Sequence, residues 1–227
     1  MKKIKIEKKY ELALNDLIYS LKDSGFLTDI QVESAFRNIH RHEFVPTSEL
    51  DRAYYNEPIP ILKDQTISQP AVVSRMTEWL DVKDGQKILE IGTGSGWQSA
   101  ILSYLVGTGA VYSVERHPEL ANFARENLEK LGIDNVHVIL DDGSLGYPNA
   151  SPYDRIIVTA ACTEIPLPLL EQLNENGLIL APVGDSSQSL ILLKKTSEGI
   201  VEIKNQTNYV FVPLLGKFGK NEIDSYR

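Results

Sequence analysis

The sequence predicts an α/β protein with a doubly wound, mostly parallel sheet, and three observations support this class. Short apolar runs alternate with segments of helical apolar spacing through the second half of the chain, as in successive βαβ units. The run at residues 88–91 ends in a glycine-rich turn and continues as a helix, as in the opening of a nucleotide-binding unit. With 42% hydrophobic and 24% charged residues, the 227-residue chain can bury a substantial core. We expect one domain over residues 1–227.

The net charge, the cysteine count and the absence of long apolar runs argue against several classes of function. A net charge of -8 disfavours a general binder of nucleic-acid phosphates. The single cysteine, Cys162, cannot form an internal disulfide, which fits a reducing compartment, so we expect a cytoplasmic protein. Residues 1–12 lack the apolar segment of a secretory signal, and no run reaches the ~20 apolar residues of a membrane span. His40 and His42 have no further ligands nearby, so we expect no metal. We also expect a monomer without nucleic-acid or membrane partners.

Residues 1–83 are expected to form a helical cover. Leucines at roughly helical spacing predict a helix over residues 7–23. Residues 28–31, Thr-Asp-Ile-Gln, match a capping box with Thr28 as the N-cap of a second helix.

A proline-rich stretch precedes the third predicted helix. Pro58 and Pro60 oppose a helix and favour extended chain over residues 51–64. A helix over residues 70–80 follows, with a proline in its first turn. Ser68 is a natural N-cap for it, so a helix cap is the simplest structural interpretation of this serine.

Residues 84–227 are expected to form the α/β core. Apolar runs predict strands over residues 88–91, 110–115, 136–140, 155–159, 178–182, 190–193, 200–203 and 209–212. Helices are expected after the glycine turn, over residues 118–131, and briefly after residue 165. The last strands follow one another without an intervening helix, which indicates an antiparallel end.

The turn Gly92-Thr93-Gly94-Ser95-Gly96 is the centre of this core. Its glycines can adopt positive φ and let a ligand approach the backbone, and the helix start leaves N–H groups free for an anionic group. The spacing is G-x-G-x-G, whereas the dinucleotide-binding fingerprint is G-x-G-x-x-G. It resembles motif I of S-adenosylmethionine-dependent methyltransferases. A tight structural turn in another α/β protein is the alternative.

Acidic residues mark the ends of the first three core strands. Glu90 ends the first, Glu115 the second, and Asp142 with Gly143 follows the third. In a doubly wound sheet the ligand lies beyond the carboxyl ends of the strands, so we expect these acids at one site. Glu115 suits two ribose hydroxyls, and Asp142 suits an adenine amino group.

Longer segments carry a more specific resemblance. They are HRHEFVP, PIPILKDQTISQPAVVSRMTEWL, VKDGQKILEIGTGSGWQSAILS, DDGSLGYPNASPYDRIIVTAACTEIPLPLLEQL and FVPLLGKFG. Together they resemble the protein-L-isoaspartate O-methyltransferase family over about residues 29–219. Thr-Ile-Ser-Gln-Pro and Phe-Val-Pro-Leu are the parts most specific to that family.

The resemblance implies a Rossmann-like methyltransferase fold with a seven-stranded sheet, and a definite reaction. The methyl group of S-adenosylmethionine passes to the free α-carboxylate of an L-isoaspartyl residue in a damaged protein or peptide, leaving S-adenosylhomocysteine. The ester then cyclises to a succinimide that opens partly to normal aspartate.

The resemblance also assigns the site. Ser68 is implied to be catalytic. The implied cofactor contacts are Thr66, Ile67, Ser68, Glu90, Gly92, Thr93, Gly94, Glu115, Arg116, Asp142 and Gly143, the implied substrate contacts are Thr66, Ser68, Val212 and Pro213, and no metal is implied.

These roles fit the chemistry. A carboxylate is already ionised at pH 7, so no general base is required, and catalysis is mainly positioning and exclusion of water. A serine hydroxyl can donate to one carboxylate oxygen while the other attacks. A lysine or arginine there would hold the anion more strongly and lower its nucleophilicity.

The chain departs from the family pattern at three places. Leu62-Lys63-Asp64 replaces a glycine-containing stretch, Asp141 replaces the first glycine of Gly-Asp-Gly, and Leu215 stands where threonine is frequent. A relative that methylates an aspartate of a dedicated peptide or protein therefore stays open.

Two other function classes are disfavoured. The glycine spacing argues against a nicotinamide-dependent oxidoreductase. The presence of Ser68, Glu115 and Asp142 argues against a non-catalytic binding module.

Overall fold

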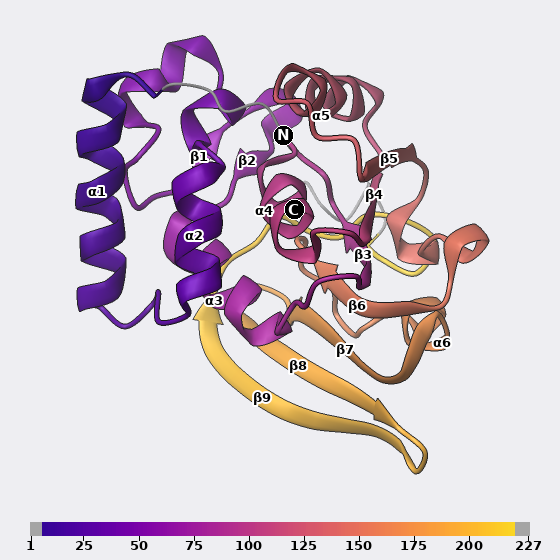
Figure 1. Ribbon diagram of the computed structural model, residues 1–227. Coiled ribbons are helices and arrows are strands. Elements are labelled where there is room, and N and C mark those ends of the chain that lie inside the picture. The colour runs from indigo at the N-terminus through magenta and orange to yellow at the C-terminus, as the bar shows by residue number, and fades with distance from the viewer. Residues whose placement is uncertain (1–5, 221–227) are drawn as a thin grey trace.

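The computed structural model describes residues 6–220, which form a seven-stranded sheet with helices on both faces (Figure 1). The strand order is β5-β4-β3-β6-β7-β8-β9; the pairs from β5 to β7 are parallel, and β8 and β9 are antiparallel. In chain order the core elements are β3 (Lys87–Ile91), α4 (Trp97–Val106), β4 (Ala110–Glu115), α5 (Pro118–Lys130), β5 (Val136–Leu140), β6 (Tyr153–Val158), α6 (Leu167–Glu171), β7 (Leu173–Val183), β8 (Gln188–Thr196) and β9 (Gly199–Tyr209). The predicted α/β class and antiparallel end are confirmed.

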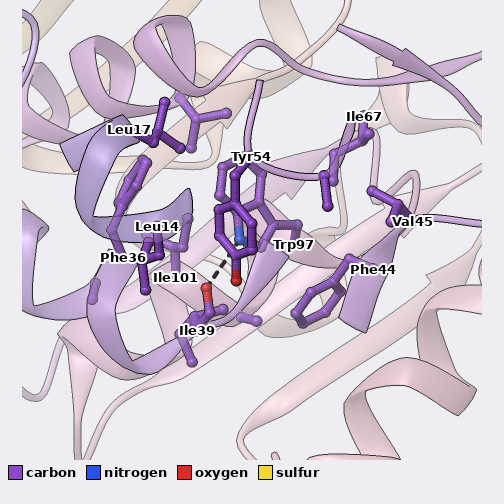
Figure 2. Close-up of a cluster of buried hydrophobic side chains, with 14 of the residues drawn as sticks. Leu14, Leu17, Phe36, Ile39, Phe44, Val45, Tyr54, Ile67, Trp97 and Ile101 are labelled. Atoms are coloured by element: carbon purple, nitrogen blue, oxygen red, sulfur yellow. Dashed lines mark hydrogen bonds between the residues drawn. The ribbon is translucent and has the colours of Figure 1, made fainter. Parts of the chain in front are cut away.

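The N-terminal part forms the expected helical cover. Helix α1 (Lys8–Asp23) packs on α2 (Ile30–Asn38), and α2 packs on α4. Their apolar faces meet the start of α4 in one buried cluster that includes Leu17, Phe36 and Trp97 (Figure 2). The remaining N-terminal elements are α3 (Pro70–Leu80) and the two-residue strands β1 (Ile59–Pro60) and β2 (Thr66–Ile67), which pair antiparallel. Short 3-10 helices occur at Arg41–Phe44, Thr47–Arg52, Leu62–Asp64, Gly143–Leu145 and Pro148–Ala150.

Two predicted helix caps are wrong. The N-cap of α2 is Asp29, whose carboxylate accepts from Gln31 N and Val32 N, because Thr28 instead donates to the carboxylate of Glu78. The N-cap of α3 is Gln69 rather than Ser68, and it makes no side-chain cap.

The first turn of α3 is capped from a distant segment. Asn56 Oδ1 accepts from Ala71 N at 2.9 Å, and Gln69 Nε2 donates to the Asn56 carbonyl at 2.9 Å. The side chain of Asn56, fifteen residues before Ala71, therefore caps α3 in place of Ser68. The Ser68 hydroxyl does not cap this helix.

The C-terminal strands differ from the prediction in their bounds. The expected strand over residues 209–212 does not form, because β9 ends at Tyr209 and the chain then crosses to the end of β6. Val212 O accepts from Ala161 N at 2.7 Å, and Phe211 N donates to the Gln188 side chain. Strand β9 is the exposed edge of the sheet, with register shifts against β8 (Figure 1).

Two further features concern cysteine and membrane segments. Cys162 is free and buried beyond β6, its Sγ lies 3.5 Å from the Pro182 carbonyl oxygen, and burial raises the pKa of its thiol to about 12. Within residues 6–220 no helix is both long and apolar enough to cross a membrane.

Candidate active site

A cavity of about 380 Å³ lies beyond the carboxyl ends of β3, β4 and β6. Its volume falls in the range of small-molecule sites. Its walls come from the glycine turn, the segment around β2, and the chain after β9. Of the predicted site residues, Thr66, Ile67, Ser68, Gly92, Thr93, Gly94, Glu115, Arg116, Gly143, Val212 and Pro213 line it, whereas Glu90 and Asp142 do not.

The glycine turn forms one wall of the cavity, and it leaves no room for a side chain at Gly92. Gly92 has φ +96°, and a Cβ there would lie 2.3 Å from Thr159 Oγ1. Thr159 donates to the carbonyls of Ile91 and Gly92 and so holds the turn against the end of β6. The turn leads into α4, whose N-cap Gly96 has φ +87°.

Glu115 is held rigidly at the end of β4. It is 6% exposed, and its two carboxylate oxygens accept from Gly94 N and His117 N, each at 3.0 Å. A carboxylate has about four lone-pair sites, so two hydroxyls of a ligand can still be accepted. The side chain lines the cavity and is pre-oriented by the glycine turn itself.

Glu90 does not reach the cavity, which differs from the contact implied by the sequence. Alternation along β3 directs it to the α4 face, where it is 0% exposed. Its Oε2 accepts from Ser99 Oγ and Ser113 Oγ, while Oε1 has no partner among the described residues. Burial raises the pKa of this carboxyl to about 7, and Glu115 adds to the shift. Glu90 therefore supports the turn from behind.

Asp142 follows β5 as expected, but its side chain does not line the cavity, whereas its neighbour Gly143 does. The Asp142 carboxylate accepts from Ser144 N, Ser144 Oγ and Lys217 N. The C-terminal loop approaches so closely that a Cβ on Gly216 would lie 2.0 Å from Asp142 Oδ1. In this structure Asp142 fastens that loop to the end of β5.

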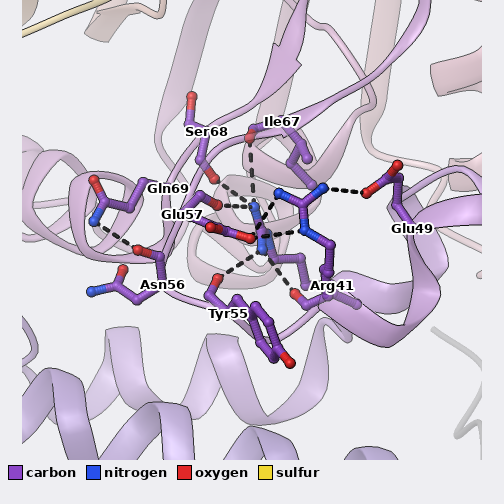
Figure 3. Close-up of polar contacts among 10 residues, drawn as sticks. Arg41, Glu49, Tyr55, Asn56, Glu57, Ile67, Ser68 and Gln69 are labelled. Atoms are coloured by element: carbon purple, nitrogen blue, oxygen red, sulfur yellow. Dashed lines mark hydrogen bonds and ion pairs between the residues drawn. The ribbon is translucent and has the colours of Figure 1, made fainter.

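Ser68 follows β2 and lines the cavity. Its carbonyl points to the Arg41 guanidinium, whereas its hydroxyl points away (Figure 3). Among residues 6–220 the hydroxyl has no hydrogen-bond partner, although Ser68 lines the cavity. A hydroxyl free in this way can donate to an anionic group in the cavity.

Several lining residues were missed in the sequence. Lys63 and Asp64, with φ of 59° and 54°, line the cavity, and so does Thr159. Thr159 is the last residue of the strand predicted over residues 155–159, so its position at a carboxyl end was a usable signal. For Lys63 and Asp64 the signal was the glycine-containing stretch that the family has at this place, because glycine is the residue that most readily adopts positive φ.

The fold and the cavity together define a class. Backbone amides of a G-x-G-x-G turn and a carboxylate at the end of the second core strand fit an amino-acid-linked nucleoside, and the doubly wound sheet with its antiparallel end fits the Rossmann-like fold of an S-adenosylmethionine-dependent methyltransferase. The structure of a Plasmodium falciparum protein-L-isoaspartate O-methyltransferase described as putative, solved with S-adenosyl-L-homocysteine, shares this fold with a TM-score of 0.78 at 24% identity, over 88% of this chain and 97% of that one.

Sequence comparison specifies the family. A family model for protein-L-isoaspartate(D-aspartate) O-methyltransferase matches residues 12–219, and the chain belongs to this family. The protein-L-isoaspartate O-methyltransferase of Methanococcoides burtonii is 47% identical over 89% of this chain and 100% of its own length. That of Pyrococcus horikoshii is 48% identical over 89% and 92%. A solved protein-L-isoaspartate O-methyltransferase has a TM-score of 0.82 at 32% identity, over 91% of this chain and 67% of that one.

Proposed function

We propose that this chain transfers the methyl group of S-adenosylmethionine to the free α-carboxylate of L-isoaspartyl residues in damaged proteins and peptides, and so starts repair through a succinimide. The observation that carries the proposal is the family match over residues 12–219, in a fold that brings Ser68 and the glycine turn to one cavity.

The glycine turn, Glu115 and Gly143 are proposed to hold the cofactor. When bound, S-adenosylmethionine supplies a methyl group on a positively charged sulfur, a leaving group that needs no further activation. Gly92 and Gly94 give the backbone clearance for the methionine part, and Glu115 accepts the ribose hydroxyls. Arg116 lies at the same wall. Glu90 and Asp142 are proposed to act indirectly, by fixing the turn and the C-terminal loop.

Ser68 is proposed to orient the substrate carboxylate. Its hydroxyl donates to one carboxylate oxygen, which leaves the other free to attack, and Thr66 lies beside it on β2. Val212 and Pro213 also line the cavity and are proposed to hold the peptide backbone. The apolar side chains of Ile67 and Val212 are proposed to exclude water from the place where the substrate carboxylate approaches the positively charged sulfur of the cofactor.

A second candidate, a carboxyl methyltransferase for an aspartate in a dedicated peptide or protein, is favoured by one observation. Lys63 and Asp64 line the cavity in left-handed conformations, where the family has a glycine-containing stretch. A set of unrelated isoaspartyl peptides separates the two: a repair enzyme accepts many, whereas a dedicated enzyme accepts few.

The setting is also a proposal. The single buried cysteine is consistent with a cytoplasmic enzyme, and a net charge of -8 with one that has no nucleic-acid partner and no attraction to anionic membranes. The register shifts of edge strand β9 disfavour pairing with another chain and so support a monomer.

The deciding experiment is methyl transfer from labelled S-adenosylmethionine to an isoaspartyl peptide, with the aspartyl isomer as the control. Label in the isoaspartyl peptide alone is the expected result. Label in neither peptide, with S-adenosylhomocysteine bound, would reject the substrate assignment while leaving the cofactor assignment intact.

A further inference from the structure

Among residues 6–220, Arg41 is the largest side chain that is fully buried, and its guanidinium contacts the backbone of Ser68. It is 1% exposed. Its Nη1 donates to the carbonyls of Ala53 and Tyr55 at 2.8 and 3.2 Å, and its Nη2 donates to those of Glu57 and Ser68 at 2.9 and 3.1 Å (Figure 3). The Ile67 carbonyl lies at 3.5 Å from the same Nη2.

These acceptors are backbone carbonyls, so the guanidinium holds chain geometry. Burial lowers the pKa of Arg41 to about 9, so the group stays charged at neutral pH. A buried charge is tolerated only where several dipoles point at it. The planar fork of arginine reaches two segments at once, residues 53–57 and 67–68, which a lysine ammonium cannot do with the same geometry.

The same side chain also touches the cofactor side of the cavity. The Arg41 guanidinium lies 5.2 Å from the centre of the Trp97 ring, and Trp97 is the first residue of α4, directly after the glycine turn. Trp97 Nε1 donates to the Ile39 carbonyl at 3.3 Å. Residues 39–41 therefore contact both the element that carries Ser68 and the element that opens the cofactor wall.

We propose that Arg41 is a positioning residue for methyl transfer: its guanidinium fixes the backbone of Ser68 relative to α4, so that the hydroxyl is aimed at the carboxylate. This inference rests on the proposed function. Misplacing a reacting group by about 1 Å lowers rates by up to about a hundredfold, so a small shift of Ser68 is enough to be measured.

The test is Arg41→Lys, which keeps the charge and loses the fork, with Arg41→Gln as a neutral variant that removes the buried charge. The matched control is Arg155→Lys. Arg155 Nε donates to the Leu80 carbonyl and its Nη2 to that of Asp81, at the far end of α3 from Ser68. Turnover is expressed per molecule that binds S-adenosylhomocysteine, so unfolded protein does not count.

We expect kcat for an isoaspartyl peptide to fall roughly ten- to a hundredfold in Arg41→Lys, with the cofactor Kd changed by less than about threefold. Arg155→Lys should lower the melting temperature and leave kcat unchanged. A kcat within twofold of wild type in both Arg41 variants would overturn the proposal, because Arg41 would then be structural only.

Hydrogen exchange tests the same inference without turnover. Amides of residues 66–69 should exchange faster in Arg41→Lys than in wild type and stay protected in Arg155→Lys. If the wild type methylates no isoaspartyl peptide, the proposed function is wrong, but hydrogen exchange still tests the positioning role of Arg41. Unchanged exchange at residues 66–69 in Arg41→Lys would reject that role.

Discussion

The part of the cavity proposed to hold the cofactor and the part proposed to hold the substrate are built in different ways. The first, called the cofactor wall below, comprises Glu115 and residues 91–97, which form a strand end, a glycine turn and a helix start that are contiguous in sequence. The second, called the substrate wall below, comprises residues 59–68 and residues 212–215, which form two-residue strands, one short 3-10 helix and irregular chain. Its geometry depends on side chains far away in sequence, such as Arg41 and Asn56.

The difference teaches that local sequence specifies one wall and tertiary contacts specify the other. A glycine turn needs backbone freedom at a few positions, which the residue types themselves provide. The substrate wall has little regular hydrogen bonding of its own, so buried polar side chains must satisfy its carbonyls. Changes in the first wall should act on cofactor binding, and changes in the second on turnover.

Ser68→Ala should have the largest effect of these variants, because it should lower kcat strongly while leaving the free energy of unfolding almost unchanged. Loss of a hydrogen bond that orients the nucleophile is worth about 2–4 kcal/mol by analogy with oxyanion-hole donors, or roughly thirty- to a thousandfold in kcat. The free energy of unfolding should change by less than about 0.5 kcal/mol, because Ser68 caps no helix. Single-turnover methylation at saturating cofactor measures the first, and urea unfolding the second. A rate within about threefold of wild type would remove Ser68 from the mechanism.

Gly92→Ala should damage the other wall. The added Cβ meets Thr159 Oγ1, and φ +96° is unfavourable for alanine, so overpacking and strain together should weaken the turn by about 2–5 kcal/mol. If about 3 kcal/mol of this destabilisation reduces the free energy of cofactor binding, the Kd for S-adenosylhomocysteine should rise roughly a hundredfold, as measured by calorimetry.

The control for Gly92→Ala is Gly25→Ala. Gly25 has φ +70° but nothing within 4 Å of a Cβ, so it carries the backbone penalty of about 1–2 kcal/mol without the collision. Cofactor affinity should be unchanged in this control. Equal loss of affinity in both variants would mean that general destabilisation, and not the turn, is responsible.

Glu90→Gln should reveal a pH-dependent effect behind the cofactor wall. Burial raises the pKa of Glu90 to about 7, so between pH 4.5 and pH 7 the folded chain keeps a proton that the unfolded chain has lost. Wild-type stability should therefore fall as the pH rises through this window, by about 2–3 kcal/mol from this group. The isosteric amide cannot ionise. Denaturant unfolding at pH 5 and pH 8 should show Glu90→Gln gaining on wild type at the higher pH, and a constant difference would contradict the assignment.

Asn56→Ala should have the smallest effect, on stability alone. Asn56 supplies the cap of α3, so its loss should lower the free energy of unfolding by about 0.5–2 kcal/mol. Comparing the thermal unfolding of Asn56→Ala and Ser68→Ala tests directly whether Asn56, and not Ser68, caps α3. A larger loss of stability in Ser68→Ala would restore the serine as the cap.

Most of the fold followed from patterns that the sequence displays locally. The alternation of strands and helices and the glycine turn are properties of neighbouring residues, so the sheet and the cofactor wall were predictable. The side-chain contacts of Glu90 and Asp142 were not, because each depends on partners such as Ser99 and Lys217 that pattern alone does not bring near. The prediction of Ser68 as the N-cap of α3 was wrong for the same reason. A serine is a suitable cap, but here the amide of Ala71 donates to the side chain of Asn56, which is distant in sequence.

Cys162 bears on the chemical durability of the enzyme. Burial keeps its thiol protonated at neutral pH, whereas peroxides, alkylating agents and disulfides react with the thiolate. It is also the only cysteine in the sequence, so no second thiol within the chain can trap it. The enzyme thus keeps its one cysteine thiol buried and protonated, and prolonged storage without a reducing agent should leave its activity intact.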